Sequence, residues 1–249
     1  MLIKQTTCRL FLTGAWQALL DTLFPIRCLG CRARNAWICD PCLSRLPVRQ
    51  EQHCPNCIKH ITPNGEVCFA CRDEGHTALS GVFVASYYHD TLLPCAIHNY
   101  KYRFLSALAN PLARFLQSAL EKTSLPLPDI IIPVPLHRKR LKFRGFNQSE
   151  LLARELASLL TPGIDLPLES DVLLRIRATT PQIKTGSREE RLHNLRDAFA
   201  IHENKVHHVA GKSVWLIDDV ATTGTTLSEC ANTLKKNGAR SVFGIVLAR

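Results

Sequence analysis

Two adjacent aspartates followed by a threonine-rich turn are the residues of this chain best suited to bind a ligand. Residues 214–226 read Val-Trp-Leu-Ile-Asp-Asp-Val-Ala-Thr-Thr-Gly-Thr-Thr. Asp218 and Asp219 can accept hydrogen bonds from sugar hydroxyls or hold Mg²⁺ through water. Hydroxyls and a permissive glycine that suit a phosphate follow them, at Thr222, Thr223, Gly224, Thr225 and Thr226. The sequence therefore predicts a sugar-phosphate pocket.

The flanking sequence predicts the elements that hold these residues. Residues 214–217 form an apolar run typical of a strand in the middle of a parallel sheet. Apolar residues then recur at helical spacing up to Asn237-Gly238, and residues 241–247 have the pattern of a further strand. Loops at the carboxyl ends of such strands bind ligands in open α/β folds. The alternative is an acidic strand end before an ordinary helix, because Thr and Asp also cap helices well.

Other segments complete a predicted α/β domain. Buried-type strands are expected at residues 81–88 and 129–134, and helices at residues 107–120 and from Asn147 to Leu160. Asn147 and Glu150 form a capping box at the start of the last helix. We expect this domain to cover residues 77–249, after a boundary near residues 72–80, and a small module to cover residues 1–76.

The small module is predicted from its cysteines. Eight of the eleven cysteines in the chain form four Cys-x-x-Cys pairs, at Cys28/Cys31, Cys39/Cys42, Cys54/Cys57 and Cys68/Cys71. Two intervening residues let both sulfurs of a pair reach one metal ion, and two pairs complete a tetrahedral site. Eight ligands therefore predict about two Zn²⁺ ions.

The spacing does not decide which of these Cys-x-x-Cys pairs, or knuckles, share a metal ion. A sequential arrangement, which we favour, joins 28/31 with 39/42 and 54/57 with 68/71, whereas an interleaved arrangement joins 28/31 with 54/57. An iron–sulfur site is a further alternative, because thiolate sets also hold clusters. A disulfide framework would need an oxidising compartment, for which the chain carries no targeting signal.

A second candidate binding segment is strongly basic. Five cations lie within seven residues, at Arg138, Lys139, Arg140, Lys142 and Arg144. We expect this segment to be a cationic loop, and Phe143 and Phe146, in it or near it, can stack on bases, as aromatic side chains do in proteins that bind single strands. The alternatives are a solvated run of charge and a site for the pyrophosphate of a ligand.

Composition excludes few functions. The chain has 249 residues, of which 46% are hydrophobic, and a formal net charge of +10, which suits nucleic acid or a pyrophosphate ligand. No run of 18 apolar residues is present, so we expect no membrane span. Leu12, Trp16, Leu19 and Leu23 share one helical face, which favours a packed helix over a signal peptide. We therefore expect a cytoplasmic protein with reduced thiols.

Motifs across most of the chain resemble a known family. Residues 214–226 look like the phosphoribosyl pyrophosphate (PRPP) motif of type I phosphoribosyltransferases. Several further motifs are similar to those of the ComF family, which includes GntX-type DNA utilisation proteins and competence proteins: Pro133-Val-Pro-Leu-His, Arg144-Gly-Phe-Asn-Gln-Ser-Glu-Leu-Leu-Ala, Thr179-x-x-Gln182, Arg188-x-x-Arg191-x-x-Asn194 and Asn99-Tyr-Lys101-Tyr. The knuckles depart from the ribbon pattern, because Arg32, Leu43, Ile58 and Arg72 replace the Gly that often follows the second Cys.

The resemblance implies a fold and a set of roles. It implies a type I phosphoribosyltransferase-like parallel sheet with helices on both faces, preceded by a cysteine-rich zinc-ribbon module. Asp218 and Asp219 would meet the ribose of PRPP with its Mg²⁺, and residues 222–226 its 5-phosphate. Residues 133–137 would take the place of the pyrophosphate loop, and residues 177–194 that of a mobile hood.

Three functions remain open on this basis. The first is a role in the uptake or use of extracellular DNA, with single-stranded DNA as a partner and proteins of the uptake machinery as further ones. The second is phosphoribosyl transfer to a base-like acceptor, and the third is a PRPP-sensing regulator. The PRPP motif predicts a pocket and does not decide whether transfer chemistry occurs in it.

Overall fold

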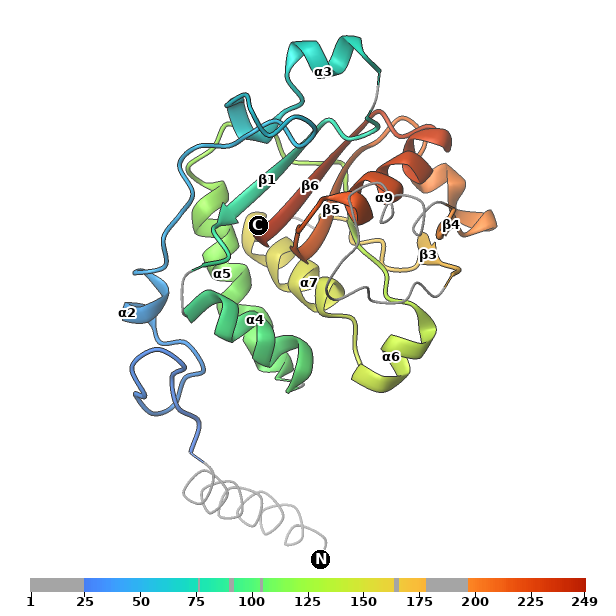
Figure 1. Cartoon of the computed structure of the whole chain (residues 1–249). Helices are drawn as coiled ribbons and strands as arrows, with labels where there is room; N and C mark the ends of the chain where they lie inside the picture. The colour runs from blue at the N-terminus through green and yellow to red at the C-terminus, as the bar shows by residue number, and fades with distance from the viewer. Residues whose placement is uncertain (1–24, 76, 90–91, 104, 164–165, 178–196) are drawn as a thin grey trace, which may run out of the picture. The chain divides into compact units, whose positions relative to one another are not determined.

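Two compact units make up the chain. The computed structural model describes residues 25–75, 77–89, 92–103, 105–163, 166–177 and 197–249 (Figure 1). One unit ends at Arg45 and the other runs from Leu46 to Arg249. The last four paired cysteines therefore lie in the same compact unit as the sheet, whereas the sequence places a domain boundary near residues 72–80.

A parallel sheet forms the centre of the larger unit. Its strands are β1 (Gly81–Ser86), β2 (Ile130–Pro133), β5 (Ser213–Val220) and β6 (Ser241–Ala248), in the order β1-β6-β5-β2. Every neighbouring pair is parallel. All four strands fall on segments predicted from their apolar runs, because a strand covered on both faces must be apolar along most of its length. Figure 1 shows β1, β6 and β5 side by side.

Helices cover both faces of this sheet. On one face lie α5 (Ala109–Leu120) and α7 (Gln148–Leu160), and on the other lies α9 (Thr225–Lys236). The core beneath α9 contains alternate residues of β5, such as Val214 and Leu216. Leu112 and Leu116 on α5 are fully buried, as their helical spacing predicts. The expected fold class is confirmed.

Two helices occur where the sequence predicts none. α4 (Leu92–Tyr102) buries Leu93, Ile97 and Tyr100 along one face. α6 (Arg138–Arg144) occupies the basic segment that we expected to be a loop. His137 caps its start, and Gly145 ends it in the left-handed conformation with φ of 78°. Lys and Arg are good helix formers, so a cationic run between a cap and a glycine is also a helix pattern.

A short antiparallel ribbon flanks the sheet. It consists of β3 (Leu173–Arg175) and β4 (Phe199–Ile201), followed by the 3₁₀ helix η3 (Glu203–His208). Phe199 packs in the core that α9 shares with the sheet. Of the hood expected at residues 177–194, only Arg177 falls within the described residues, and the helix expected near Trp16 lies outside them.

Among the described residues, neither edge of the sheet has a further strand, and each is covered by other chain segments. At the β1 edge, Gln52 donates from Nε2 to the Val84 carbonyl at 2.9 Å and accepts from the Val84 amide at 3.0 Å. Beside it, the Arg49 amide donates to the Ala85 carbonyl at 2.8 Å. At the β2 edge, the Ile131 amide donates to the carbonyl of Pro167 at 2.8 Å. These buried backbone groups of both edges are thereby satisfied.

The remaining elements are short and belong mainly to the cysteine-rich segments. These are α2 (Asp40–Leu43), η1 (Pro63–Gly65), α3 (Phe69–Asp73) and, before α5, η2 (Ser106–Leu108). α2 and α3 each begin directly after a paired cysteine, Cys39 and Cys68 respectively.

Candidate functional site

The two aspartates of the predicted pocket lie at the carboxyl end of β5. The neighbouring strand β2 ends beside them, because Pro133 pairs with Ile217 in the parallel register. Asp219 is buried, with 2% of its surface exposed, and Asp218 is half-buried. The structure therefore brings the acidic pair and the segment after β2 to one edge of the sheet, where open α/β folds bind ligands.

Asp218 is held by hydrogen bonds to one of its oxygens. Its Oδ1 accepts from Ser149 Oγ at 3.0 Å and from the Asp219 amide at 2.9 Å. Burial, and then the charge of Asp219, raise the pKa of Asp218 to about 7, although the charge of Lys101 acts in the opposite direction. Asp218 is therefore poised to exchange a proton near neutral pH.

Asp219 forms an ion pair with a residue that the sequence does not single out as a site residue. Lys101 Nζ, at the end of α4, lies 2.8 Å from Asp219 Oδ1. Burial opposes the charge of Lys101, but the charge of Asp219 and the hydrogen bond to it hold the pKa of Lys101 above its ordinary value. A lysine between two tyrosines, in the Asn99-Tyr-Lys-Tyr motif, is the sequence signal that marks it.

The threonine-rich turn leads from β5 into α9. Gly224 is the N-cap of α9 with φ of 75°, and no side chain of the described residues caps this helix end. The space where a Cβ would stand at Gly224 is open, so it is the left-handed backbone that requires glycine. Thr223 Oγ1 and Thr225 Oγ1 lie 2.8 Å apart. The uncapped amides and paired hydroxyls form a cradle suited to a phosphate.

The segment after β2 borders a pocket of about 510 Å³. His137 and Asn147 line it from the β2 side, and Leu174 and Arg175 line it from the β3 side. Asn147 Nδ2 donates to the Val134 carbonyl at 3.1 Å and its Oδ1 caps α7 by accepting from the Ser149 amide. The expected cap is confirmed, but Glu150 pairs with Arg154 at 3.0 Å instead of closing a capping box.

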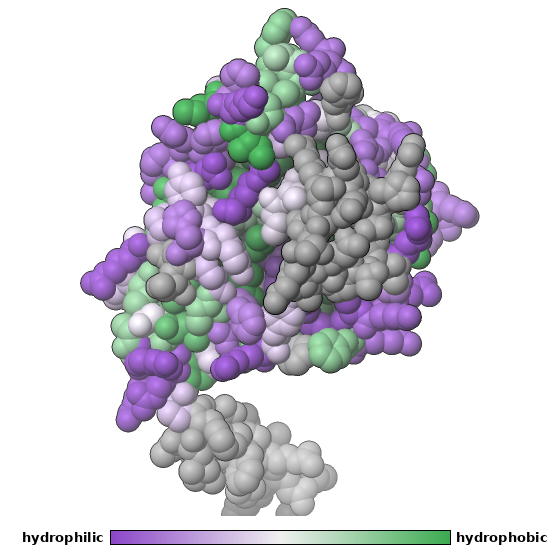
Figure 2. Space-filling view, in the orientation of Figure 1, coloured by the Kyte–Doolittle hydropathy of each residue, from purple (hydrophilic) through white to green (hydrophobic). Residues whose placement is uncertain are grey.

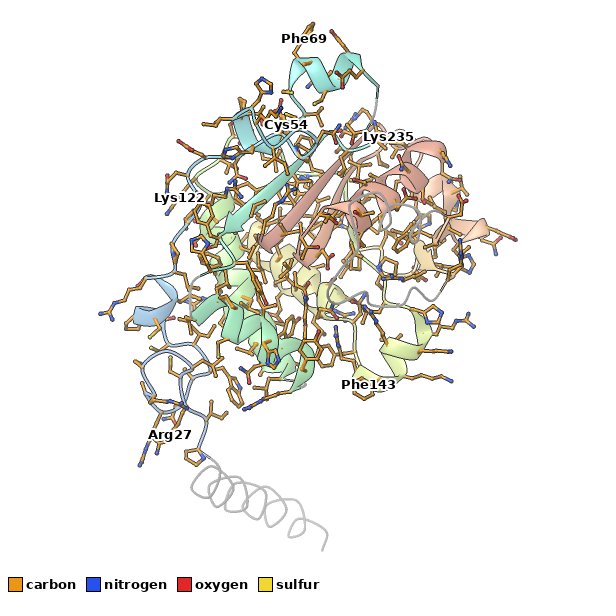
Figure 3. The ribbon with its side chains drawn as sticks, viewed as in Figure 1. Arg27, Cys54, Phe69, Lys122, Phe143 and Lys235 are labelled. Carbon is orange, nitrogen blue, oxygen red and sulfur yellow. The ribbon has the colours of Figure 1, made fainter. Side chains whose placement is uncertain are left out.

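The side chains of the basic helix α6 differ in their exposure to solvent. Arg138, Lys139 and Lys142 are exposed, and Arg140 is half-buried. Phe143 is 78% exposed and projects from the helix (Figure 3). The surface around α6 is mostly hydrophilic with an apolar spot (Figure 2).

At the end of this segment, Arg144 and Phe146 each pack against a tyrosine ring of α4. The guanidinium of Arg144 lies 5.7 Å from the centre of the Tyr102 ring and also contacts Gln148. Burial lowers the pKa of Arg144, while the charge of Asp219 acts against this shift. The Phe146 ring packs 5.8 Å from that of Tyr100. Of the two phenylalanines expected to stack on bases, Phe143 is therefore the more accessible.

The paired cysteines gather into two tetrads. The first comprises Cys28, Cys31, Cys39 and Cys42, and the second Cys54, Cys57, Cys68 and Cys71, with all ligand atoms of a tetrad within 4.8 Å of one another. This is the sequential pairing. The Sγ atoms of Cys31 and Cys39 lie 3.5 Å apart and those of Cys57 and Cys68 lie 3.8 Å apart. Tetrahedral Zn–S bonds of about 2.3 Å place sulfurs about 3.8 Å apart, so each tetrad fits zinc.

The knuckles keep their turns without the glycine that often follows the second cysteine. Arg32 donates its amide to the Cys28 carbonyl, and Ile58 to the Cys54 carbonyl, both at 3.0 Å. Arg32 and Ile58 have φ of 66° and 60°, which is the left-handed region that glycine enters most easily. In the other two knuckles, Leu43 and Arg72 are part of α2 and α3 and need no such conformation.

Family models match both parts of the chain. A double zinc ribbon domain matches residues 19–72, and a phosphoribosyl transferase domain matches residues 147–249. "DNA utilization protein YhgH" of Escherichia coli O157:H7 is 36% identical over 226 residues, which cover 88% of this chain and 94% of that protein. "Competence protein F" of Haemophilus influenzae is 30% identical over 235 residues, which cover 91% of this chain and 98% of that protein.

The chain belongs to the ComF family. A more distant relative, "Competence protein ComFC" of Bacillus subtilis, is 26% identical over 217 residues, which cover 85% of this ComF chain and 84% of that protein. Among solved structures, a glutamine PRPP amidotransferase from B. subtilis aligns with a TM-score of 0.37 and 19% identity, over 56% of this chain and 26% of that chain. This similarity is too low to add to the family assignment.

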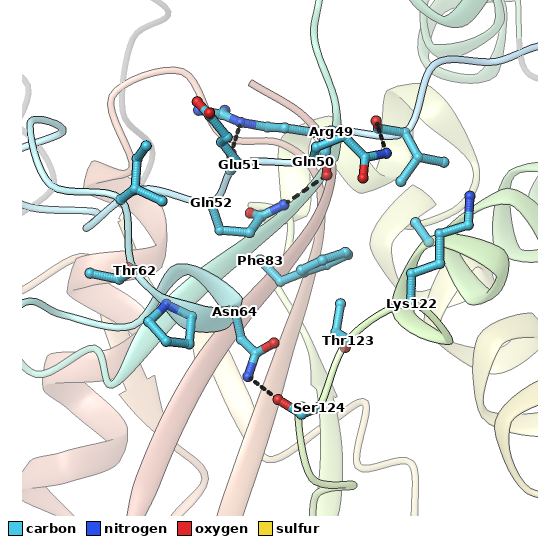
Figure 4. A pocket seen from close by; sticks show the side chains of 14 residues that line it. Arg49, Gln50, Glu51, Gln52, Thr62, Asn64, Phe83, Lys122, Thr123 and Ser124 are labelled. Atoms are coloured by element: carbon cyan, nitrogen blue, oxygen red, sulfur yellow. Dashed lines mark hydrogen bonds between the residues drawn. The ribbon is translucent and has the colours of Figure 1, made fainter.

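Another pocket of this ComF chain lies away from the acidic pair. Its volume is about 470 Å³, and Gln50, Asn64 and Lys122 are among the residues that line it (Figure 4). Asn64 Nδ2 donates to Ser124 Oγ at 3.3 Å across its lower side in that view. None of its lining residues comes from the end of β5 or from the threonine-rich turn.

Within the described ranges, no helix combines the length and apolar character needed to cross a bilayer.

Proposed function

We propose that the chain acts in the use of DNA taken up from outside the cell, and that it does so with a pocket for PRPP and Mg²⁺. The relatives named for DNA utilisation and competence support the first part. The observation that carries the second is the geometry at the end of β5, where Asp218 and Asp219 stand beside an uncapped helix N-terminus. Reduced thiols are needed for zinc, so we place this activity in the cytoplasm.

Different residues of the pocket would contact different parts of PRPP. Oxygens of Asp218 and Asp219 would accept from ribose hydroxyls, and the cradle at 222–226 would hold the 5-phosphate. Residues 133–137 lie beside the acidic pair and would face the pyrophosphate. The role of Mg²⁺ would be to neutralise pyrophosphate charge.

Binding of PRPP tests this assignment directly. Calorimetry with zinc-loaded protein, PRPP and MgCl₂ should give a saturable signal that the double variant Asp218→Asn with Asp219→Asn loses. Both side chains lie at the exit of β5, so circular dichroism of the variant should still show a folded sheet. An unchanged affinity in a folded double variant would contradict the pocket assignment.

We also propose that single-stranded DNA binds along α6. The exposed cations Arg138, Lys139 and Lys142 would contact phosphates, and Phe143 offers a ring on which a base can stack. Competition between PRPP and DNA in salt titrations would show that they share a basic surface, whereas independent binding would show two surfaces. Proteins of the uptake machinery are further candidate partners.

Phosphoribosyl transfer is a second candidate function. It is favoured by the pocket of about 510 Å³ next to residues 133–137, which offers room for an acceptor beside the proposed pyrophosphate site. Transfer would depend on holding the reactants and stabilising charge, and so needs no protein nucleophile. Release of pyrophosphate from PRPP would establish it, while PRPP binding without release would favour an accessory or sensing role.

A further inference from the structure

The end of α4 contacts the proposed pocket from outside the PRPP motif. Tyr100 is fully buried and donates from its hydroxyl to the Gln148 carbonyl at 2.8 Å, at the start of α7. Tyr102, two residues on, lies under the guanidinium of Arg144. These contacts tie the last turn of α4 to α6 and α7, so Lys101, which lies between the two tyrosines, projects from a fixed backbone.

Lys101 uses this position to pair with Asp219. Its Nζ lies 2.8 Å from Asp219 Oδ1, and the exposed fractions of the two side chains are 21% and 3%. The last turn of a helix also favours a cation through the helix dipole. A pair this far removed from water is screened little by salt and has a defined geometry, unlike most surface ion pairs.

The second oxygen of Asp219 has no such partner among the described residues. Asp219 Oδ2 is buried and accepts no hydrogen bond from the described residues. By contrast, Asp218 Oδ1 accepts two hydrogen bonds. A buried carboxylate oxygen without a donor is costly, and a site of this kind is completed when a ligand hydroxyl donates to it.

We propose that Lys101 is a positioning residue that fixes the Asp219 carboxylate through Oδ1 and so leaves Oδ2 to accept from a ribose hydroxyl. This inference rests on the proposed PRPP pocket and adds to it a residue on α4, outside the phosphoribosyl transferase match. Lys101 then acts on the sugar end of the ligand through Asp219, and does not contact the pyrophosphate itself.

Two partial ligands distinguish contacts to the sugar end of PRPP from contacts to its pyrophosphate. Ribose 5-phosphate probes the sugar end, and inorganic pyrophosphate with Mg²⁺ probes the other. Lys101→Met should weaken ribose 5-phosphate and PRPP by the same factor, about 10-fold or more, and leave pyrophosphate affinity unchanged. Lys101→Arg should keep most of the affinity because it keeps the cation. Lys122→Met is the matched control, since Lys122 is exposed in the other pocket (Figure 4).

A double variant tests whether Lys101 acts through Asp219. In an Asp219→Asn background, adding Lys101→Met should cause no further loss of ribose 5-phosphate affinity, because the carboxylate to be positioned is already gone. This double variant replaces the ion pair by two neutral side chains, so it remains informative if Lys101→Met alone does not fold. A further loss in the double variant would overturn the proposal.

Other results would also overturn it, and they are distinguishable from failure of the proposed function. If Lys101→Met weakens pyrophosphate and PRPP but not ribose 5-phosphate, Lys101 contacts the pyrophosphate directly. If Lys101→Met lowers only the melting temperature, its role is structural. In both cases the PRPP pocket stands, whereas a parent protein that binds neither PRPP nor ribose 5-phosphate would refute the pocket and this role together.

Discussion

The side chain of Gln52 makes with Val84 the two hydrogen bonds that a neighbouring strand would make. Its Nε2 donates to the Val84 carbonyl at 2.9 Å, and its Oε1 accepts from the Val84 amide at 3.0 Å. Gln52 lies two residues before Cys54, a ligand of the second tetrad. The segment that carries the second metal site is therefore joined to the edge of the sheet through backbone groups of β1.

Removal of this amide should destabilise the larger unit. Gln52→Ala leaves a buried N–H and a buried carbonyl without partners, so we expect the free energy of unfolding to fall by about 2–4 kcal/mol. Denaturant titration followed by far-UV circular dichroism measures it. Gln50→Ala is the control, because Gln50 is exposed and its change should stay within about 0.5 kcal/mol. Equal effects of the two substitutions would contradict the role of Gln52.

The two cysteine tetrads should differ in how their loss affects the sheet. Cys28→Ser and Cys54→Ser should each release one of about two Zn²⁺ ions, measured by metal analysis of reduced protein. Cys54 lies in the compact unit that holds the sheet, whereas Cys28 lies in the other. We therefore expect Cys54→Ser to lower the melting temperature of the sheet by more. A parent protein with a single ion, or equal shifts in both variants, would refute this prediction.

Asp218 should make stability depend on pH near neutrality. Its pKa of about 7 in the folded protein exceeds an unfolded value of about 3.9, so the folded state binds the extra proton between these values. Its contribution to stability is therefore present at low pH and is lost as the pH rises toward 7. Asp218→Asn removes this loss, so the variant should gain stability relative to the parent between pH 5 and pH 8.

Asp129→Asn provides a control of opposite sign. Hydrogen bonds from the Ser213 backbone and side chain lower the pKa of Asp129, so its contribution is complete above about pH 4. The unfolding free energy of the Asp129→Asn variant should therefore lie below that of the parent by a constant amount from pH 5 to pH 8. If Asp218→Asn gives a curve parallel to the parent instead, Asp218 does not titrate in this range.

DNA binding along α6 should depend on salt through its cations. Removing one cation that binds a phosphate lowers the salt slope by about 0.7 for a single strand, so Arg138→Ala with Lys142→Ala, which removes two of the exposed cations, should flatten it by a unit or more. Fluorescence anisotropy with a labelled oligonucleotide at several salt concentrations measures the slope. Arg114→Ala with Lys122→Ala removes the same charge from α5 and the residues that follow it, and should change the slope little. The same slope in the α6 variant and the parent would place the DNA surface elsewhere.

The parts of the fold that the sequence predicts are those with a strong local signal. All four parallel strands lie on segments that the sequence predicts as strands, the helices α5 and α9 follow from their apolar periodicity, and α7 follows from its cap at Asn147. The expectation of a loop at α6 is wrong, because the charge of this segment conceals its helix-forming residues and Gly145 at its end. The β3–β4 ribbon escapes prediction because strands of three residues carry almost no periodicity.

The site shows the same division between local and distant information. The acidic pair and the threonine-rich turn are contiguous in sequence, so their proximity follows from one strand, one loop and one helix. Lys101 and Ser149 reach the same two carboxylates from α4 and α7. Their partners lie far away along the chain, so only packing of these helices against the sheet reveals the contacts.

The covers on the two edges of the sheet have consequences for synthesis of the chain. Gln52 is made before β1, whereas the segment at Pro167 is made after β2. In a nascent chain the cover for the outer side of β1 is thus available when β1 emerges. The outer side of β2 remains open until about thirty more residues have followed it. The inner sides of both strands pair with β6 and β5, which are made last, so strand addition to an incomplete chain should begin at these inner sides and not at the covered outer side of β1.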